Sequence, residues 1–95
     1  MDYKIRILPR ASLEISDALK WYSSRNLKAG KELLKEINLI YDLLRFDPYL
    51  FNEIKKGYRQ VPLKKFPFLI IYRIFKDQIL IQSVFNTHQN PTKKP

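Results

Sequence analysis

The sequence contains no cysteine, only two glycines and a single histidine among its 95 residues. The lack of cysteine excludes disulfide bonds, thiolate nucleophiles and cysteine-based zinc sites. Two glycines leave little room for a glycine-rich loop of the kind that binds phosphate. With one histidine and scattered acidic residues there is no cluster of metal ligands, so we expect neither a metal nor another cofactor.

Long apolar runs are also missing. Met1–Arg10 has no uninterrupted apolar stretch, and the longest run, Phe66–Tyr72, is far shorter than the roughly 20 residues of a membrane helix. We therefore expect no secretory signal, no membrane association and a cytoplasmic location. The length predicts a single domain over residues 1–95, and the 45% of hydrophobic and 14% of aromatic residues supply a modest core.

Acidic residues become scarce in the second half of the chain. Residues 1–50 carry 9 Lys/Arg and 7 Asp/Glu, whereas residues 51–95 carry 9 Lys/Arg and 2 Asp/Glu, so most of the net charge of +9 lies in the second half. A basic half favours a polyanionic partner, which can be RNA, DNA or an acidic protein segment. The alternative is that the charge only aids solubility.

The first half of the chain predicts one strand and two helices. Residues 3–7 alternate between apolar and charged, as in a half-buried strand that Pro9 ends. Apolar residues at helical spacing then predict a helix over Ser12–Ser24, with its first residue as the N-cap, and a second helix over Ala29–Phe46. The short break between them predicts an antiparallel helical hairpin. The apolar faces expected to pack on a sheet are formed by Ile15, Ala18, Leu33, Leu34, Ile37, Ile40, Tyr41 and Leu44.

The second half of the chain changes to the period of β-strands. We expect strands over Tyr58–Leu63, Phe68–Phe75 and Gln78–Phe85, the middle one nearly all apolar and therefore central. The polar residues 87–95 are expected to form a loose tail. The order is β-α-α-β-β-β, which predicts an α+β fold in which the helical hairpin covers one face of an antiparallel twisted sheet, with the first strand beside a later one.

Candidates for binding a target lie in this second half: Arg59, Lys64, Lys65, Arg73, Asn86 and His88. Cleavage of RNA by its 2′-OH needs a base, an acid and cations that stabilise the phosphorane. For that reaction the catalytic candidates are Arg59, Arg73 and His88, with the two arginines as candidates for converging on one face of the sheet. Each residue has a simpler alternative: a surface charge, a solvated loop lysine, an incidental histidine or an asparagine that caps a turn.

Two pairs on the first helix also have simple explanations. Glu14 and Asp17 lie three residues apart, like paired carboxylates, but such a pair is expected on a solvated helix face. Trp21 and Tyr22 are expected to pack in the core or between helices rather than to form a stacking platform.

Residues along the whole chain point to one family. The residues Ala11, Glu14, Ile15, Ala18, Trp21 and Tyr22 follow the pattern A-x-x-E-[IL]-x-x-A-x-x-W-Y. Further matches are Gly30 in the second helix, Pro48 and Phe51 at its exit, Tyr58 and Arg59 in the next strand, and Phe66-Pro-Phe with Ile71 and Tyr72 in the central strand. Val84–Pro91 is similar to the ending V-x-H-x-x-R-[ND]-P. In this order and spacing, over residues 2–91, the sequence resembles the RelE/ParE toxins of bacterial type II toxin–antitoxin systems.

The resemblance implies an α+β fold, a cognate antitoxin as partner and one of two targets. Ribonuclease members of the family carry an arginine in the central strand where Leu69 stands, and Asn86 and Gln89 replace the family's closing histidine and arginine. These differences favour a ParE-like growth inhibitor that binds DNA gyrase over a RelE-like endoribonuclease that cleaves mRNA on the ribosome. A third alternative is a binding module without toxicity. We expect the antitoxin to cover apolar surface and to pair with the basic second half.

Overall fold

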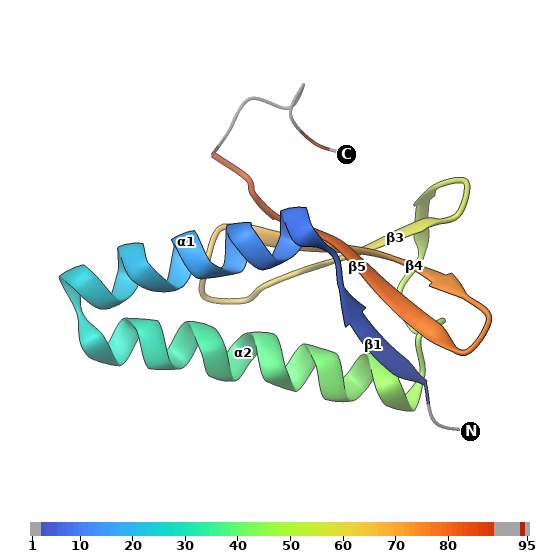
Figure 1. Ribbon diagram of the computed structural model, residues 1–95, viewed down its shortest axis with the longest axis horizontal. Coiled ribbons are helices and arrows are strands. Elements are labelled where there is room, and N and C mark those ends of the chain that lie inside the picture. Colours follow the sequence, from blue (N-terminus) through green and yellow to red (C-terminus); the bar gives the residue numbers. More distant parts are fainter. Residues whose placement is uncertain (1–2, 89–93, 95) are drawn as a thin grey trace.

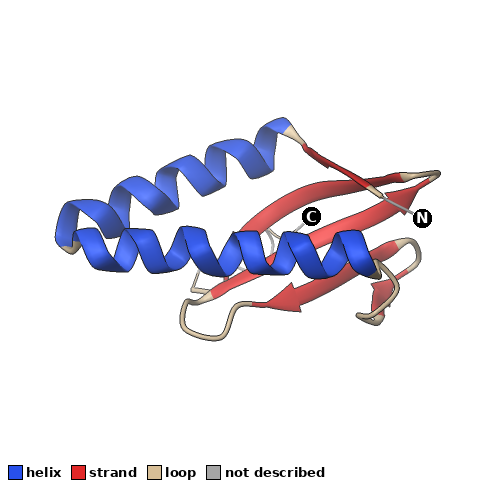
Figure 2. Ribbon diagram, turned by 90° about the horizontal axis from the view of Figure 1, so that it is seen from below, coloured by secondary structure: helices blue, strands red, loops and turns tan. Residues whose placement is uncertain are grey.

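The fold was analysed in a computed structural model that describes residues 3–88 and residue 94. It consists of β1 (Lys4–Ile7), α1 (Pro9–Arg25), α2 (Leu27–Phe46), β2 (Glu53–Lys55), β3 (Tyr58–Pro62), β4 (Phe68–Phe75) and β5 (Gln78–Asn86). The two helices form an antiparallel hairpin that lies on one side of the twisted sheet (Figures 1 and 2). The predicted α+β class is confirmed.

The first helix begins earlier than expected. Pro9 is its first residue and Leu8 its N-cap, and the backbone N–H of Ser12 donates to the Leu8 carbonyl at 2.9 Å, so Ser12 lies inside the helix rather than at its cap. Proline fits this place because the first-turn N–H groups have no partner within the helix and the ring fixes a helical φ. The same residue therefore ends the strand and starts the helix.

A single residue joins the two helices. The N–H of Asn26 donates to the Tyr22 carbonyl and closes α1, while its side-chain oxygen accepts from the backbone N–H of Lys28 at 3.0 Å and caps α2. One residue thus serves both helix ends, α1 through its backbone N–H and α2 through its side-chain oxygen. The connection brings Gly30 against Ser23, where an added Cβ would lie 3.1 Å from the Ser23 Cβ.

The sheet has five strands in the order β1-β5-β4-β3-β2. β5 pairs antiparallel with β4 but parallel with β1, in the register Lys4↔Gln78 to Ile7↔Ile81. The expected sheet, in which every pair is antiparallel, is therefore corrected to a mixed one. Short turns make neighbouring later strands antiparallel. Two helices separate β1 from the next strand, so β1 can pair with its neighbour in either a parallel or an antiparallel direction. β2 was not predicted, because its three residues are exposed and too short to show a period.

The core lies between the helices and the sheet. From α2 the inward residues Leu33, Ile37 and Leu44 are at most 1% exposed, while Leu34, expected among them, is 44% exposed. The buried face of α2 is thus narrower than the face that the sequence predicts. Ile40 and Tyr41 of α2 are buried as well, as expected. The sheet, the loop after β3 and α1 supply the remaining buried members of this core: Ala11, Ala18, Val61, Leu63, Phe68, Ile70, Tyr72, Ile79, Ile81 and Val84.

Alternate residues of β4 face opposite sides of the sheet. Ile70 and Tyr72 belong to the core beneath the helices. Ile71 and Arg73 point to the other side, where Ile71 is nonetheless fully buried and Phe85 of β5 is 4% exposed. The face without helices therefore has a small apolar centre of its own.

Candidate functional site

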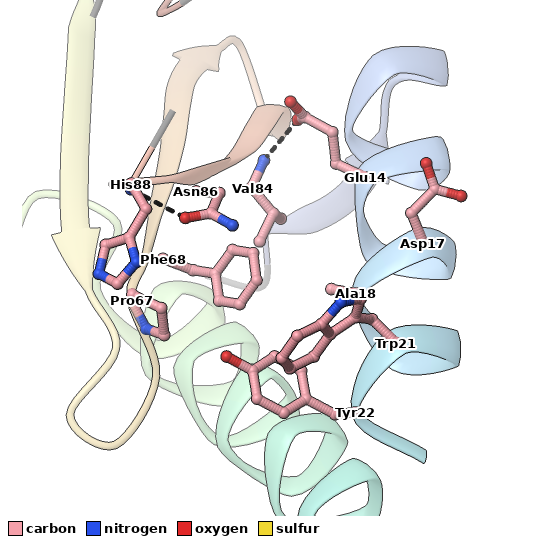
Figure 3. A pocket seen from close by; sticks show the side chains of 10 residues that line it. All are labelled: Glu14, Asp17, Ala18, Trp21, Tyr22, Pro67, Phe68, Val84, Asn86 and His88. Carbon is pink, nitrogen blue, oxygen red and sulfur yellow. Dashed lines mark hydrogen bonds between the residues drawn. The ribbon is translucent and has the colours of Figure 1, made fainter. Parts of the chain in front are cut away.

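A groove of about 430 Å³ runs between α1 and the end of the sheet (Figure 3). α1 forms one wall, and the opposite wall comes from the start of β4, the end of β5 and the residues after it. The lining residues are Glu14, Asp17, Ala18, Trp21, Tyr22, Pro67, Phe68, Val84, Asn86 and His88. Two of the six candidates from the sequence, Asn86 and His88, are thus brought to this groove.

The floor of the groove is aromatic. The Tyr22 ring lies edge-on to Phe66 and Phe68, with centroid distances of 5.0 and 6.2 Å. Trp21 is 52% exposed, and the Arg25 guanidinium lies 3.7 Å above its ring centroid. Tyr22 packs on the core as expected, whereas Trp21 does not, because it stands on the side of α1 that the sheet fails to cover. An indole in this position is an exposed apolar anchor.

Glu14 ties α1 to β5. One carboxylate oxygen accepts from Ser83 Oγ at 2.6 Å and from the Val84 backbone N–H at 2.9 Å, and the other lies 3.3 Å from Arg10. The pairing of β4 with β5 is irregular here, since Ile71 faces Ser83 but the next pair skips one residue of β5. β1 pairs with β5 only as far as Ile81, so β1 offers no partner to the Val84 N–H, which the Glu14 carboxylate binds instead. The expectation that Glu14 is merely solvated is therefore wrong.

Asp17 differs from Glu14 although it lies less than one turn away. It is exposed at the rim of the groove, and within the described part of the chain no ion pair involves it. The pair does not act as two coupled carboxylates, since one carboxylate is fixed to the sheet and the other faces solvent. The expectation of a solvated position holds for Asp17 alone.

The opposite rim is held by a turn after β5. The Asn86 side-chain oxygen accepts from the His88 N–H at 2.8 Å, and Thr87 donates from both its N–H and its hydroxyl to the Pro67 carbonyl. Asn86 therefore caps this turn, which agrees with the alternative of a turn-capping asparagine. The rest of the tail expected at residues 87–95 lies outside the described residues, apart from residue 94.

The two candidate arginines lie on opposite faces of the sheet. Arg59 pairs with Tyr72, so it shares the face beneath the helices, and Arg73 follows on the other face. Arg59 donates to the Phe51 carbonyl and lies 3.6 Å from the Glu53 carboxylate, whereas Arg73 lies 5.8 Å from the Tyr58 ring centroid. The arginines therefore do not converge.

His88 is also remote from both arginines. Asn86 pairs with Phe68 at the first residue of β4, and Arg73 lies five residues further along the same strand. At about 3.3 Å per residue this separation is roughly 16 Å. The three residues that would form a nuclease site therefore occupy different parts of the molecule.

Lys64 and Lys65 lie in the loop between β3 and β4, and α2 holds that loop in place. The Glu36 carboxylate accepts from the Lys64 N–H at 3.0 and 3.2 Å and from the Lys65 N–H at 3.3 Å. Both residues are exposed. The anchored backbone presents two cations at a fixed place on the surface.

Two buried tyrosines serve the fold. The Tyr72 hydroxyl donates to the Pro48 carbonyl at 2.8 Å and fastens the chain after α2 to the sheet. Burial raises the pKa of Tyr72 to about 12, against the lowering effect of Arg59 and with a smaller raising effect of Asp47. Burial likewise raises the pKa of Tyr41 to about 12, and Arg45 lowers it slightly. Such phenols stay protonated at neutral pH and are poor bases.

Residues 3–88 and 94 contain no group of three histidine or acidic side chains placed to hold a metal ion. Within the same part of the chain neither helix combines the length and the apolar character that crossing a membrane requires.

Comparison with known proteins gives the family. The family described as "ParE toxin of type II toxin-antitoxin system, parDE" matches residues 5–91. A solved structure from the chromosomal ParDE system of P. aeruginosa superposes with a TM-score of 0.76 at 13% identity, covering 90% of this chain and 97% of that one, which is a likeness of fold. No curated protein matches the chain in sequence. Because the family match spans nearly the whole chain, the chain belongs to the ParE toxin family of type II toxin–antitoxin systems.

Proposed function

We propose that the chain is a growth-inhibiting toxin that acts in the cytoplasm by binding DNA gyrase and is neutralised by a cognate antitoxin. The observation that carries the proposal is the ParE family match over residues 5–91. The similar structure from P. aeruginosa comes from a ParDE toxin–antitoxin system, which supports a protein partner for this chain as well.

The geometry supports inhibition by binding rather than by RNA cleavage. A nuclease has to bring a proton acceptor and cations to one phosphate. Here the Arg59 guanidinium is engaged with Phe51 and Glu53, Arg73 lies on the other face, and His88 is remote from both. Leu69 stands where ribonuclease members of the family carry an arginine, and Asn86 stands where the family carries its closing histidine. Neither side chain can supply the cation or the proton transfer of the residue it replaces.

The groove beside α1 fits the antitoxin. Its floor is aromatic, and its rim carries the half-exposed Trp21, which suits an amphipathic segment laid into an apolar groove. The cations best placed to meet the target are Lys64, Lys65 and Arg73, because the other candidates are engaged within the fold or line the groove. We assign the groove to the antitoxin and these cations to gyrase.

The test is expression of the chain without its antitoxin, followed by assays with purified components. We expect growth arrest with DNA-damage signalling, inhibition of supercoiling by purified gyrase, and intact mRNA on isolated ribosomes. His88→Gln, if still folded, should keep gyrase inhibition, since binding requires no proton transfer at that position.

Two outcomes would replace this proposal. Codon-specific mRNA cleavage on isolated ribosomes that His88→Gln abolishes would establish the endoribonuclease instead. Normal growth in the presence of abundant, folded chain, with neither assay responding, would leave a binding module without toxicity.

A further inference from the structure

α2 has a second apolar face that the fold does not use. Leu39, Leu43 and Phe46 are 54%, 46% and 87% exposed, and we call these three residues the outer stripe. Their spacing of i, i+4 and i+7 places them on one side of the helix, opposite the face that carries Leu33 and Ile37 into the core. Single exposed leucines are ordinary, but three large apolar side chains in register form a contiguous patch.

A shallow depression extends this patch toward the start of α2. It is lined by Lys31, Leu34, Lys35, Asn38, Leu39 and Asp42. Asp42 is 2.9 Å from Arg45, so its charge is neutralised within the helix. Within the described part of the chain, no ion pair involves Lys31 or Lys35. The depression is therefore basic toward the start of α2, and the apolar outer stripe lies further along the helix.

This arrangement is complementary to one kind of occupant. An amphipathic helix can bury the outer stripe with apolar residues at i, i+3/i+4 and i+7, and acidic residues at one end of it can pair with Lys31 and Lys35. A second copy of the chain fits less well, because each copy carries a net charge of +9 and like charges oppose association.

We propose that the outer face of α2 binds an acidic amphipathic helix of the antitoxin, at a site separate from the groove beside α1. The two surfaces share no lining residue, since the groove is built from α1, β4, β5 and the turn after them. The partner then contacts both helices of the hairpin from different sides. This inference rests on the proposed existence of a cognate antitoxin.

The experiment measures binding between the purified chain and the acidic protein encoded by the neighbouring reading frame. Leu39→Ser/Leu43→Ser should weaken binding by about tenfold or more, because buried apolar anchors carry most of an interface's affinity. Leu13→Ser is the matched control, since Leu13 is an exposed leucine, 64% accessible, outside both surfaces. All these variants should remain folded with a cooperative urea transition, because the changed side chains lie outside the core.

The two lysines of the depression are tested separately, by the rate of association. Lys31→Glu/Lys35→Glu should slow association, and the wild-type association rate should fall with salt more steeply than that of this variant. Equal affinity of the wild type and the outer-stripe variant would overturn the inference while leaving the antitoxin in place. Absence of binding by the wild type would remove the proposed antitoxin and the inference with it. A wild-type dimer that the outer-stripe variant dissociates would assign the face to a second copy and overturn the inference.

Discussion

The two faces of the sheet bury their apolar residues in different ways. On the face beneath the helices, Ile70 and Tyr72 are fully enclosed by side chains from α1 and α2. On the other face, Ile71 is equally buried although no helix packs on that side. The first face stabilises the fold through contacts between layers, whereas the second keeps a small apolar centre with a charged side chain, Arg73, close by.

The largest expected loss of stability comes from a comparison of two adjacent residues of β4, Ile70 and Leu69. Ile70→Ala should lower the free energy of unfolding by about 3 kcal/mol, because it leaves a cavity between sheet and helices. Leu69→Ala, on the other face and only half-buried, should lower it by about 1 kcal/mol. Urea titrations with an unchanged m-value measure both. Equal losses would mean that both faces contribute alike to stability.

A second comparison uses the two arginines. Arg59→Ala should lower the free energy of unfolding by about 2 kcal/mol, because it leaves the Phe51 carbonyl and the Glu53 carboxylate without their cation. Arg73→Ala should change it by less than about 0.5 kcal/mol, since among the described residues this side chain has a cation–π contact with the Tyr58 ring and no ion pair. Thermal unfolding of both variants provides the measurement. A large loss at Arg73 would place a structural network on the open face.

A third comparison concerns the buried phenols of the covered side, whose effect appears only at alkaline pH. Tyr41 and Tyr72 have pKa values raised to about 12, above the value near 10 of an unfolded chain. The folded state thus holds these protons more tightly, so stability is complete below pH 10 and falls as the pH rises toward 12, by roughly 1 kcal/mol per pH unit for each ring.

Replacement of both phenols should flatten this pH dependence. We expect a shallower loss of stability for Tyr41→Phe/Tyr72→Phe in urea titrations between about pH 9 and 11. At neutral pH the variant should lose about 1 kcal/mol, the hydrogen bond from Tyr72 to Pro48, because Tyr41 makes none in the described part of the chain. An alkaline slope equal to that of the wild type would assign the loss to other groups.

The sequence predicts the elements of this fold better than their pairing. Leu33, Ile37 and Leu44 recur at helical spacing, and Phe68–Phe75 is a continuous apolar run, so the second helix and the central strand could be found with correct types and nearly correct bounds. The direction of β1 could not, because two helices separate it from its neighbour and no turn chemistry fixes its orientation.

The candidate site was less accessible to sequence reasoning because it depends on register. Whether Arg59 and Arg73 share a face is decided by which residues of β3 and β4 pair, and a shift of one residue reverses the answer. The sequence predicts a solvated Glu14 because its partners, Ser83 and Val84, lie about 70 positions away at an irregularity in β5. An acidic residue on an otherwise inward-facing helix position was the available signal.

The parallel pairing of β1 with β5 has a consequence for biosynthesis. Lys4 lies beside Gln78, 74 positions later in the chain, so β1 has to wait for β5 while the residues between them are made. Closing such a distant contact is slow compared with forming helices and hairpins. Until β5 is made, β1 lacks its neighbour, one edge of β4 is unpaired and Glu14 has no backbone to bind. The sheet is thus incomplete until β5 is made, and it is completed when β5 pairs with both β4 and β1.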